Sequence, residues 1–549
     1  CHIDSRVAWL NWPEATNVEF TTADELDSAV DDADLVDGVP TLRFLSAAAL
    51  TEDSNFLRNR CLSLSPPRSV WPQLVRSAIK QGHSLSLVHL ATVWPFDEFS
   101  VLDTAPLSFT ATIDSLQKPS SCRNLALSEI WSLICLAVIN RCRNNSASSA
   151  TAPASIRYHL PGQPPSAQQQ FAFLDQLASC GDVSRSVQVD LDVAVEGQNE
   201  LLRLASVVSR CYRGQLRLRR LCVASVHPMK LLSVVNELKI GSWRSINEES
   251  LPISVCLTDT DLSIGSLSQV NASQLWQSLL DNATCLDLSR SRLDRRSVIS
   301  LGALLGLASV DPNNAANATP MSSRLQHLNL SGNPGIQLPS FGSIVGNLTA
   351  LCLAGCRLRA NSSDLLAVIN ACRLTLQHLD LSDNPLLLPV EMIETSGASF
   401  YELFRLQRLS SLRLACLTSP GGLDREIGAN GSNSSVALLL DSVLTGCPKL
   451  CRLDISDWPV GTRDWATSLL PILLTSSDVS RSHSLKLLVL SWPRGYQADD
   501  WSDGSGEFRD AEDGEDFEEF QAELDIEARD SYAAGVDRLQ SAGCGLVWV

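Results

Sequence analysis

Three short stretches of the chain repeat one spacing of leucines, and this spacing decides the fold. They read LQHLNLSGN at residues 325–333, LTALCLAGCRL at 348–358 and LQHLDLSDNPL at 376–386. Each has two leucines separated by one variable residue, followed three positions later by an Asn or a Cys. Because alternate residues of a strand face opposite ways, the leucine pair predicts a short strand with one apolar face. The Asn or Cys side chain is then placed to satisfy backbone groups in the turn after the strand.

The full pattern, L-x-x-L-x-L-x-x-N/C-x-L, is that of the leucine-rich repeat. Weaker copies begin at Ala283, Leu409, Leu450 and Leu485, and degenerate ones are found at 215–223 and 253–257. Successive strands of such repeats stack into one parallel sheet, and the spacing between copies leaves room for helices on its other side. The sequence therefore predicts an α/β leucine-rich repeat solenoid, a ribonuclease-inhibitor-like horseshoe, with an N-terminal helical cap.

The residues that flank the leucines predict the concave face of this solenoid. Strand alternation places them on the side opposite the apolar core. They are mixed in type and mildly acidic: Asp287, His327, Asn329, His378, Asp380, Arg413, Arg452 and Asp454. Two interpretations stay open for this face, a surface that binds a protein target and an ordinary solvated sheet surface.

Composition changes along the chain predict its organisation. Residues 1–40 are acidic and are expected to form a flexible leader, and residues 41–145 have helical apolar spacing. Residues 146–170 are rich in Ser, Ala, Pro and Gln and are expected to form a linker or loop. The repeat domain follows over 171–549. It includes an acidic insert at 499–530, which is either a solvated segment or a contact for a basic partner.

Charge and composition exclude several classes of function. The 549 residues carry 43 Lys and Arg against 61 Asp and Glu, a net charge of −18, which argues against nucleic-acid binding. No apolar run is long enough to span a membrane. The 17 Cys are odd in number and scattered, which is typical of reduced thiols in a cytoplasmic or nuclear protein. The pairs Cys352/Cys356 and Cys447/Cys451 could suggest metal ligands, but structural thiols are favoured, and no motif predicts a metal, a cofactor or a catalytic site.

Two segments ahead of the repeats resemble docking motifs for ubiquitin-ligase subunits. TLRFLSAAAL at 41–50 places Leu42, Ser46 and Leu50 on one helical stripe, and with Thr41 it resembles the elongin-binding box. PPRSVWPQL at 66–74 resembles a cullin-2 box, with Pro67, Val70 and Leu74 as its contacts. The alternative interpretation is an ordinary amphipathic helix that caps the repeats.

The wider sequence around these segments resembles the PRAME family. WPQLVRSAIKQGHSL at 71–85 leads into LVHLATVWPF at 87–96, and LVLSWPRGY at 488–496 is followed by a closing GLVWV at 545–549. The resemblance implies a non-enzymatic substrate receptor of a cullin-2–elongin B/C ubiquitin ligase, whose helices dock the ligase while the horseshoe holds a target. It also implies an alternative: a scaffold or inhibitor that binds a kinase of the NF-κB pathway without recruiting a ligase.

Overall fold

A computed structural model of the chain describes 35–36, 39–40, 42–57, 59, 69–100, 125–144, 156–160, 165–180, 187–211, 215–227, 229–232, 234, 253–258, 260–262, 271, 274–275, 283–293, 325–334, 336, 348–358, 363–385, 404–416, 432–458, 465–476, 485–490, 530–541 and 544–548. Most of the predicted acidic leader lies outside these residues, as does nearly all of the acidic insert.

Within the described residues, one sheet of 13 strands runs in chain order from β3 to β15, and neighbouring strands pair in parallel from β3 to β6 and from β8 to β15. The strands are β3 (Glu98–Ser100), β4 (Ile156–His159), β5 (Val187–Glu196), β6 (Leu216–Ala224), β7 (Ile253–Thr258), β8 (Ala283–Asp287), β9 (His327–Asn329), β10 (Ala350–Cys352), β11 (His378–Asp380), β12 (Ser411–Arg413), β13 (Arg452–Asp454), β14 (Leu487–Leu490) and β15 (Gly545–Trp548). The parallel sheet with helices confirms the predicted α/β solenoid.

The chain divides into two compact units. The first comprises residues 1–226 and 233–255, and the second comprises 227–232 and 256–549. Each unit is described by itself below.

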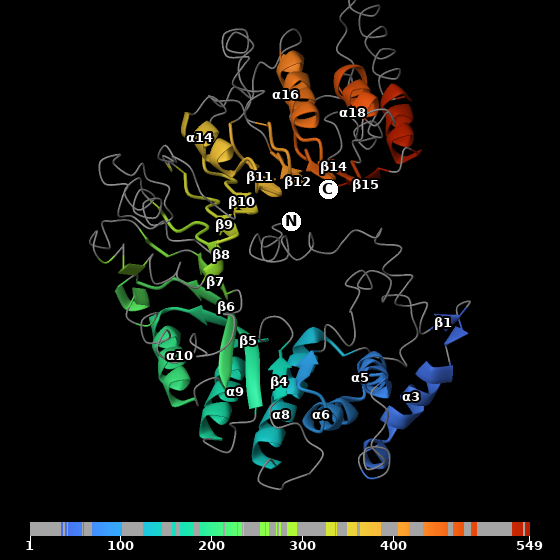
Figure 1. The fold of residues 1–549 in the computed structure, drawn as a ribbon, viewed down its shortest axis with the longest axis vertical. Helices are drawn as coiled ribbons and strands as arrows, with labels where there is room; N and C mark the ends of the chain where they lie inside the picture. The colour runs from blue at the N-terminus through green and yellow to red at the C-terminus, as the bar shows by residue number, and fades with distance from the viewer. Residues whose placement is uncertain are drawn as a thin grey trace, which may run out of the picture. The chain divides into compact units, whose positions relative to one another are not determined.

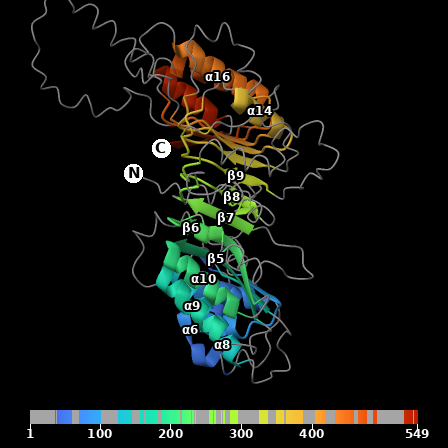
Figure 2. The ribbon, with the colours of Figure 1, turned by 90° about the vertical axis from the view of Figure 1, so that its left-hand side faces the viewer.

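In the first unit, helices cover one face of strands β4 to β6 (Figures 1 and 2). Its helices are α3 (Leu42–Glu52), α4 (Ser54–Phe56), α5 (Val70–Lys80), α6 (Ser84–Thr92), α8 (Leu127–Asn144), α9 (Ala167–Ser179) and α10 (Gln198–Arg210). A separate antiparallel pair joins β1 (Leu35–Val36) to β2 (Val39–Pro40). Helices α8, α9 and α10 contact β5, whose valines and leucine at alternate positions are buried. This alternation gives the strand its apolar, helix-facing side.

Aromatic side chains join the helices of this unit to its first strands. The ring of Trp94 lies 5.7 Å from that of Trp71 on α5 and 4.9 Å from that of Phe99 on β3. The hydroxyl of Tyr158 on β4 donates to the carbonyl oxygen of Ala91 at 2.7 Å. These contacts fix α5 and α6 to the strands because each ring is buried and the phenol has its partner.

In the second unit, the leucines of successive repeats stack in register. Leu328, Leu351, Leu379 and Leu412 pair across neighbouring strands, and all of them are buried. Helices α14 (Ser363–Cys372), α16 (Ser432–Gly446) and α18 (Leu470–Ser476) lie on one side of these strands (Figure 1). A π-helix, η6 (Trp465–Leu469), precedes α18, and residues 530–541 are also helical. The stacked leucines form the predicted core.

The turns after strands β8 to β13 each contain a residue with a left-handed backbone at the third position after the strand. The positions are equivalent in six consecutive repeats: Arg290, Gly332, Gly355, Asp383, Cys416 and Asp457. Their N–H groups extend the hydrogen-bond ladder beyond the strands, as when Gly332 donates to Ala354 at 2.7 Å and Gly355 donates to Ser382 at 2.9 Å. At the positions that are not glycine this conformation costs about 1 kcal/mol, which the regular ladder offsets.

The sheet begins earlier in the chain than the sequence analysis predicts. Strand β3 lies within the predicted helical region 41–145, and strand β4 lies within the predicted linker 146–170. Strand β4 forms because Ile156 and Tyr158 are buried on one side of it, although Ser, Ala and Pro precede it. A four-residue strand inside a polar segment leaves little periodic signal.

Among the described residues, no helix combines the length and the apolar character that crossing a membrane requires.

Candidate functional site

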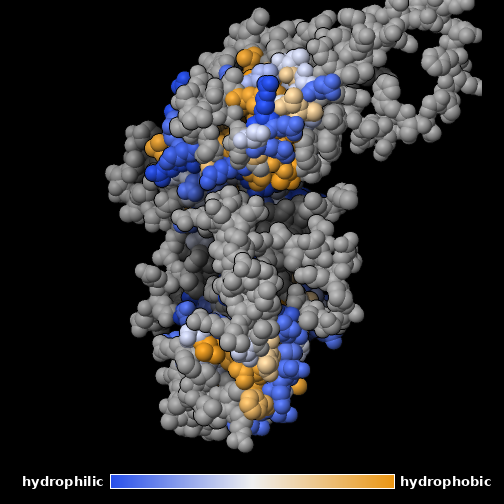
Figure 3. Space-filling view, turned by 90° about the vertical axis from the view of Figure 1, so that its right-hand side faces the viewer, coloured by the Kyte–Doolittle hydropathy of each residue, from blue (hydrophilic) through white to orange (hydrophobic). Residues whose placement is uncertain are grey.

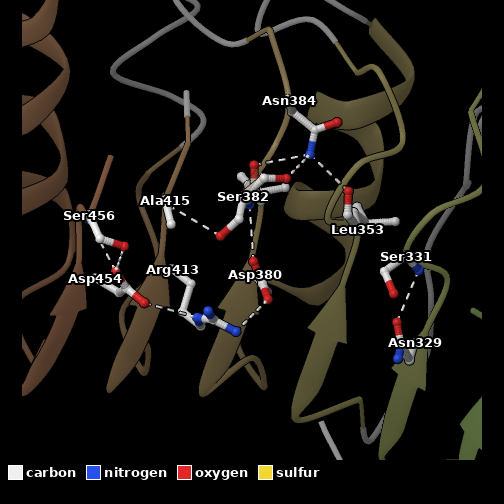
Figure 4. Close-up of polar contacts among 11 residues, drawn as sticks. Asn329, Ser331, Leu353, Asp380, Ser382, Asn384, Arg413, Ala415, Asp454 and Ser456 are labelled. Carbon is white, nitrogen blue, oxygen red and sulfur yellow. Dashed lines mark hydrogen bonds and ion pairs between the residues drawn. The ribbon is translucent and has the colours of Figure 1, made fainter. Parts of the chain in front are cut away.

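A row of short polar side chains lies along the sheet of the second unit. It contains Asp287, Asn329, Asp380 and Asp454, each between the two leucine-type positions of its strand. In each repeat the side-chain Oδ1 accepts a hydrogen bond from the backbone N–H of a serine two residues later. Figure 4 shows this bond for Asn329, Asp380 and Asp454. The donors are Ser289, Ser331, Ser382 and Ser456, at 2.9 to 3.2 Å. These side chains therefore stabilise the turns that end their own strands.

Arg413 connects two of these turns across three strands. Its Nη1 donates to Asp380 Oδ2 at 3.3 Å, and its Nε donates to Asp454 Oδ2 at 3.1 Å (Figure 4). Each carboxylate thus gives one oxygen to its own turn and the other to Arg413. Burial alone would lower the pKa of Arg413, but the two carboxylates raise it above its ordinary value.

The predicted concave face is therefore mostly closed, which corrects its interpretation as a row of accessible contacts. Asp287, Asn329, His378, Asp380 and Asp454 are buried, with exposed fractions of 2 to 6 %. Only His327, Arg413 and Arg452 are partly exposed. The reason is that the acidic and amide groups are used within the repeat turns and by Arg413. For Asp287, burial raises the pKa of the carboxyl group despite its bond from Ser289.

A second row of polar residues on the same face is formed by the first residues of successive strands. His378 pairs in register with Ser411, and Ser411 pairs with Arg452. Burial lowers the pKa of His378 to about 4, and His327 and Arg452 add to this effect by charge repulsion. Burial also lowers the pKa of His327. Both imidazoles are thus neutral near pH 7.

Protonation of His378 at low pH is expected to lower the free energy of unfolding. Because the pKa of His378 is lower in the folded state, the neutral imidazole makes its full contribution to the stability of the fold above the unfolded pKa of 6.5. This contribution is lost as the pH falls towards the folded pKa of about 4. At pH 5 the loss is about 2 kcal/mol relative to pH 8. Between pH 8 and pH 5 we expect the free energy of unfolding of His378→Gln to fall by about 2 kcal/mol less than that of the wild type. Urea unfolding of both proteins at pH 8 and pH 5 measures the difference, and equal pH dependence would contradict it.

Helix α3 carries the residues that resemble the elongin-binding box, but the side of the helix that is buried is a different one. Ala47 and Thr51 are buried, whereas Ser46 is exposed and Leu50 is partly exposed. Thr51 fixes the helix: its Oγ1 lies 3.0 Å from His83 Nδ1, and its carbonyl oxygen accepts from Ser86 Oγ at 2.5 Å. Leu42 is the first residue of α3, but its side chain lies outside the described part, as does Thr41.

The cullin-box residues are placed less favourably. Val70 begins α5 and is partly exposed, and Pro67 lies outside the described residues. Leu74 is only 1 % exposed, because α5 buries Trp71, Leu74, Val75, Ala78 and Ile79 along one stripe. Leu74 therefore belongs to the core in this structure and is not offered to a partner. The 3.6-residue spacing of this stripe is a sequence signal that favours the core assignment.

The first unit contains a polar cluster that no sequence motif predicts. Asp190 on β5 is fully buried between His159 on β4 and Arg217 on β6. His159 Nδ1 lies 3.1 Å from Asp190 Oδ2, and Arg217 Nε lies 3.8 Å from Asp190 Oδ1. The alternation in QVDLDV (188–193) and LRLRR (216–220) is the available signal, since charges alternate with core residues. Like Arg413, the cluster crosses neighbouring strands.

The cysteines with metal-like spacing have structural positions. Cys356 Sγ contacts the carbonyl oxygen of Leu330 at 3.1 Å, which is the predicted turn role for this repeat position. Burial raises the pKa of Cys356 to about 12 and raises that of Cys352 well above its usual range. In the part of the chain that the structure describes, no group of three or more His, Cys, Asp or Glu is arranged to hold a metal ion.

Comparison with known proteins agrees with the repeat geometry. A family profile described as Leucine Rich Repeat matches residues 375–395, which contain strand β11 and Asn384. The chain contains leucine-rich repeats. A comparison with curated proteins finds no match. Among solved structures, the complex of Rad7 and Elc1 in yeast is similar with 12 % identity and a TM-score of 0.37, over 79 % of this chain and 91 % of that one. At this TM-score the similarity supports no inference about the partners of the repeat protein.

Proposed function

We propose that this leucine-rich repeat protein is a non-enzymatic adaptor, the substrate-recognition subunit of a cullin-2–elongin B/C ubiquitin ligase. Helix α3 recruits elongin, and the sheet of the second unit holds the target protein. Support comes from the box-like segment at 41–50 and from the resemblance to the PRAME family, in particular to leucine-rich repeat-containing protein 14. In this proposal α5 and α6 also serve as the N-terminal cap, and the protein works in the cytoplasm or the nucleus.

The orientation of α3 is the observation that carries the proposal. The helix is fixed to α5 and α6 through Ala47 and Thr51, so its packed stripe is not the box stripe. Ser46 stays exposed and Leu50 stays partly exposed, which leaves this side of the helix open to a partner. Figure 3 views the side of Figure 1 on which α3 and α5 lie, and in its lower part apolar side chains lie beside hydrophilic ones. An apolar stripe on an exposed helix is a usual docking surface.

Contact with cullin-2 has narrower support. Of the three proposed cullin contacts, Leu74 is buried, so Val70 is the residue of α5 that a partner could reach. We therefore propose that elongin makes the main contact and that the start of α5 adds to it.

The elongin proposal predicts a large effect of charge on α3. Leu42→Asp places a carboxylate at the position that would fill an apolar pocket, and we expect the recovery of elongin B/C in a pull-down to fall by at least about tenfold. The matched control is Leu85→Asp on α6, because Leu85 is 66 % exposed in the same unit and lies outside the box. The control should recover elongin as the wild type does.

The same experiment separates the two functional interpretations. Wild-type protein that captures no elongin, or a Leu42→Asp variant that captures it fully, would contradict the ligase proposal. Binding of an NF-κB-pathway kinase by both proteins, without elongin, would instead favour a scaffold that inhibits by occlusion.

A further inference from the structure

Three polar residues lie side by side at the beginning of strands β11, β12 and β13. His378 pairs with Ser411, and Ser411 pairs with Arg452, so the three side chains share one face of the sheet. Two residues later the same strands carry Asp380, Arg413 and Asp454. The two rows therefore lie next to each other on this face.

Two atoms of the first row are buried without a hydrogen-bond partner among the described residues: the hydroxyl oxygen of Ser411 and the Nε of Arg452. Ser411 is 2 % exposed, and Arg452 is partly exposed. Buried polar groups nearly always have partners, because losing water without replacement is unfavourable. Two such atoms on adjacent strands, at paired positions, indicate a place where a ligand supplies the missing contact.

The charge balance indicates the sign of that ligand. Arg413 is engaged by Asp380 and Asp454, which both contact it directly. Arg452 has no carboxylate within ion-pair distance in the described part of the chain. Burial lowers the pKa of Arg452, Arg413 lowers it further, and Asp454 raises it only in part. Arg452 is thus a cation that its surroundings do not fully compensate, and an anion beside it would be favourable.

We propose that Ser411 and Arg452 bind an oxyanion presented by a target protein, either the carboxylate of an Asp or Glu side chain or the phosphate of a phosphorylated one. The guanidinium and the hydroxyl supply donors, and His378, neutral at pH 7, lies beside them in register. This inference deepens the target-binding part of the proposed function. It identifies what the target must present and leaves the recruitment of elongin to α3.

Calorimetric titration with three synthetic peptides tests the proposal on the full chain. The probes are an octaglutamate peptide, an octaglutamine peptide with one central phosphoserine, and octaglutamine alone. We expect one or both anionic peptides to bind and octaglutamine not to bind, and the tighter anionic peptide identifies the source of the anion. Arg452→Gln should weaken binding by about tenfold or more, as expected for a hydrogen bond to a charged group. Arg408→Gln removes the same charge at an exposed position and should bind as the wild type does.

Thermal unfolding distinguishes a binding role from a structural one. Ser411→Ala removes a hydroxyl that lacks a partner, so the melting temperature should stay the same or rise while anion binding weakens several-fold. Binding of neither anionic peptide, or equal binding by wild type and Arg452→Gln, would overturn the proposal. So would a Ser411→Ala variant that melts earlier but binds unchanged. The titration contains no elongin, so its failure is separate from failure of the elongin pull-down.

Discussion

Replacing Asn384 by alanine is expected to lower the free energy of unfolding by about 4 kcal/mol. Asn384 is fully buried, and its Nδ2 donates to the carbonyl oxygens of Leu353 at 2.8 Å, Leu381 at 3.0 Å and Ser382 at 3.0 Å. Its Oδ1 accepts from the N–H of Leu358 at 2.9 Å. Alanine leaves these backbone groups buried without partners, and each such group costs about 1–3 kcal/mol. Urea unfolding followed by circular dichroism measures the loss.

The repeat itself supplies a matched variant for this experiment. Cys356 occupies the equivalent position one repeat earlier, and its sulfur contacts the carbonyl oxygen of Leu330. Asn384→Cys should therefore keep one contact and lose about half as much stability as Asn384→Ala. Asn55→Ala, at an exposed position of α4, should change stability by less than about 0.5 kcal/mol. An Asn384→Ala variant as stable as Asn55→Ala would show that the side chain does not hold the turn.

The turn position occupied by Asn384 was predictable because its role depends on one repeat and its neighbour. Asn333 donates to Leu288 O, and Asn384 donates to Leu353 O, as the sequence pattern predicts. A different residue type can also supply the donor at this position. In a later repeat Trp458 occupies it, and its Nε1 donates to the carbonyl oxygen of Leu414 at 2.6 Å. The sequence pattern does not predict this role for Trp458, because the pattern contains Asn or Cys at this position, whereas the structure requires only a hydrogen-bond donor of suitable length.

For the polar residues between the leucines of each strand, the sequence predicts the correct face of the sheet but not their burial. Alternation alone places Asp380 opposite the leucines, and this was predictable. Its burial was not, because it depends on Arg413 standing in register with Asp380 on one side and Asp454 on the other. Segments of different lengths separate these residues in the chain, so only the pairing of strands brings them together. The cluster of Asp190 with His159 and Arg217 escaped prediction for the same reason.

In the candidate docking helices α3 and α5, by contrast, the spacing within one segment is enough to predict which residues lie on the same side of the helix. The stripe Ser46–Leu50 was predictable from helical spacing, and the structure keeps it off the packed side. Leu74 fits a short docking motif, yet it also fits the apolar stripe of α5 with Trp71 and Ile79. A short motif that coincides with the core spacing of a helix is more safely interpreted as core, because burial of the whole stripe outweighs any one contact.

Replacing Arg413 by leucine is expected to destabilise the repeat unit by about 3 kcal/mol, because it leaves two carboxylates close together without their shared cation. Asp380 and Asp454 are each 4 % exposed, and one oxygen of each faces Arg413. Breaking a buried ion pair on one side is costly since the remaining charge stays desolvated. Chemical unfolding of the full chain at pH 7 measures the loss.

Neutralising the carboxylates together with the arginine separates charge from shape in this network. In the triple variant Asp380→Asn, Arg413→Leu and Asp454→Asn, none of the three network positions carries a charge, and each Asn can still accept from the serine N–H of its turn. Asn329 does this naturally, accepting from Ser331 at 2.9 Å. We therefore expect the triple variant to recover most of the stability that Arg413→Leu loses. If the triple variant remains as unstable as the single one, the loss comes from the missing arginine side chain and not from its unpaired partners.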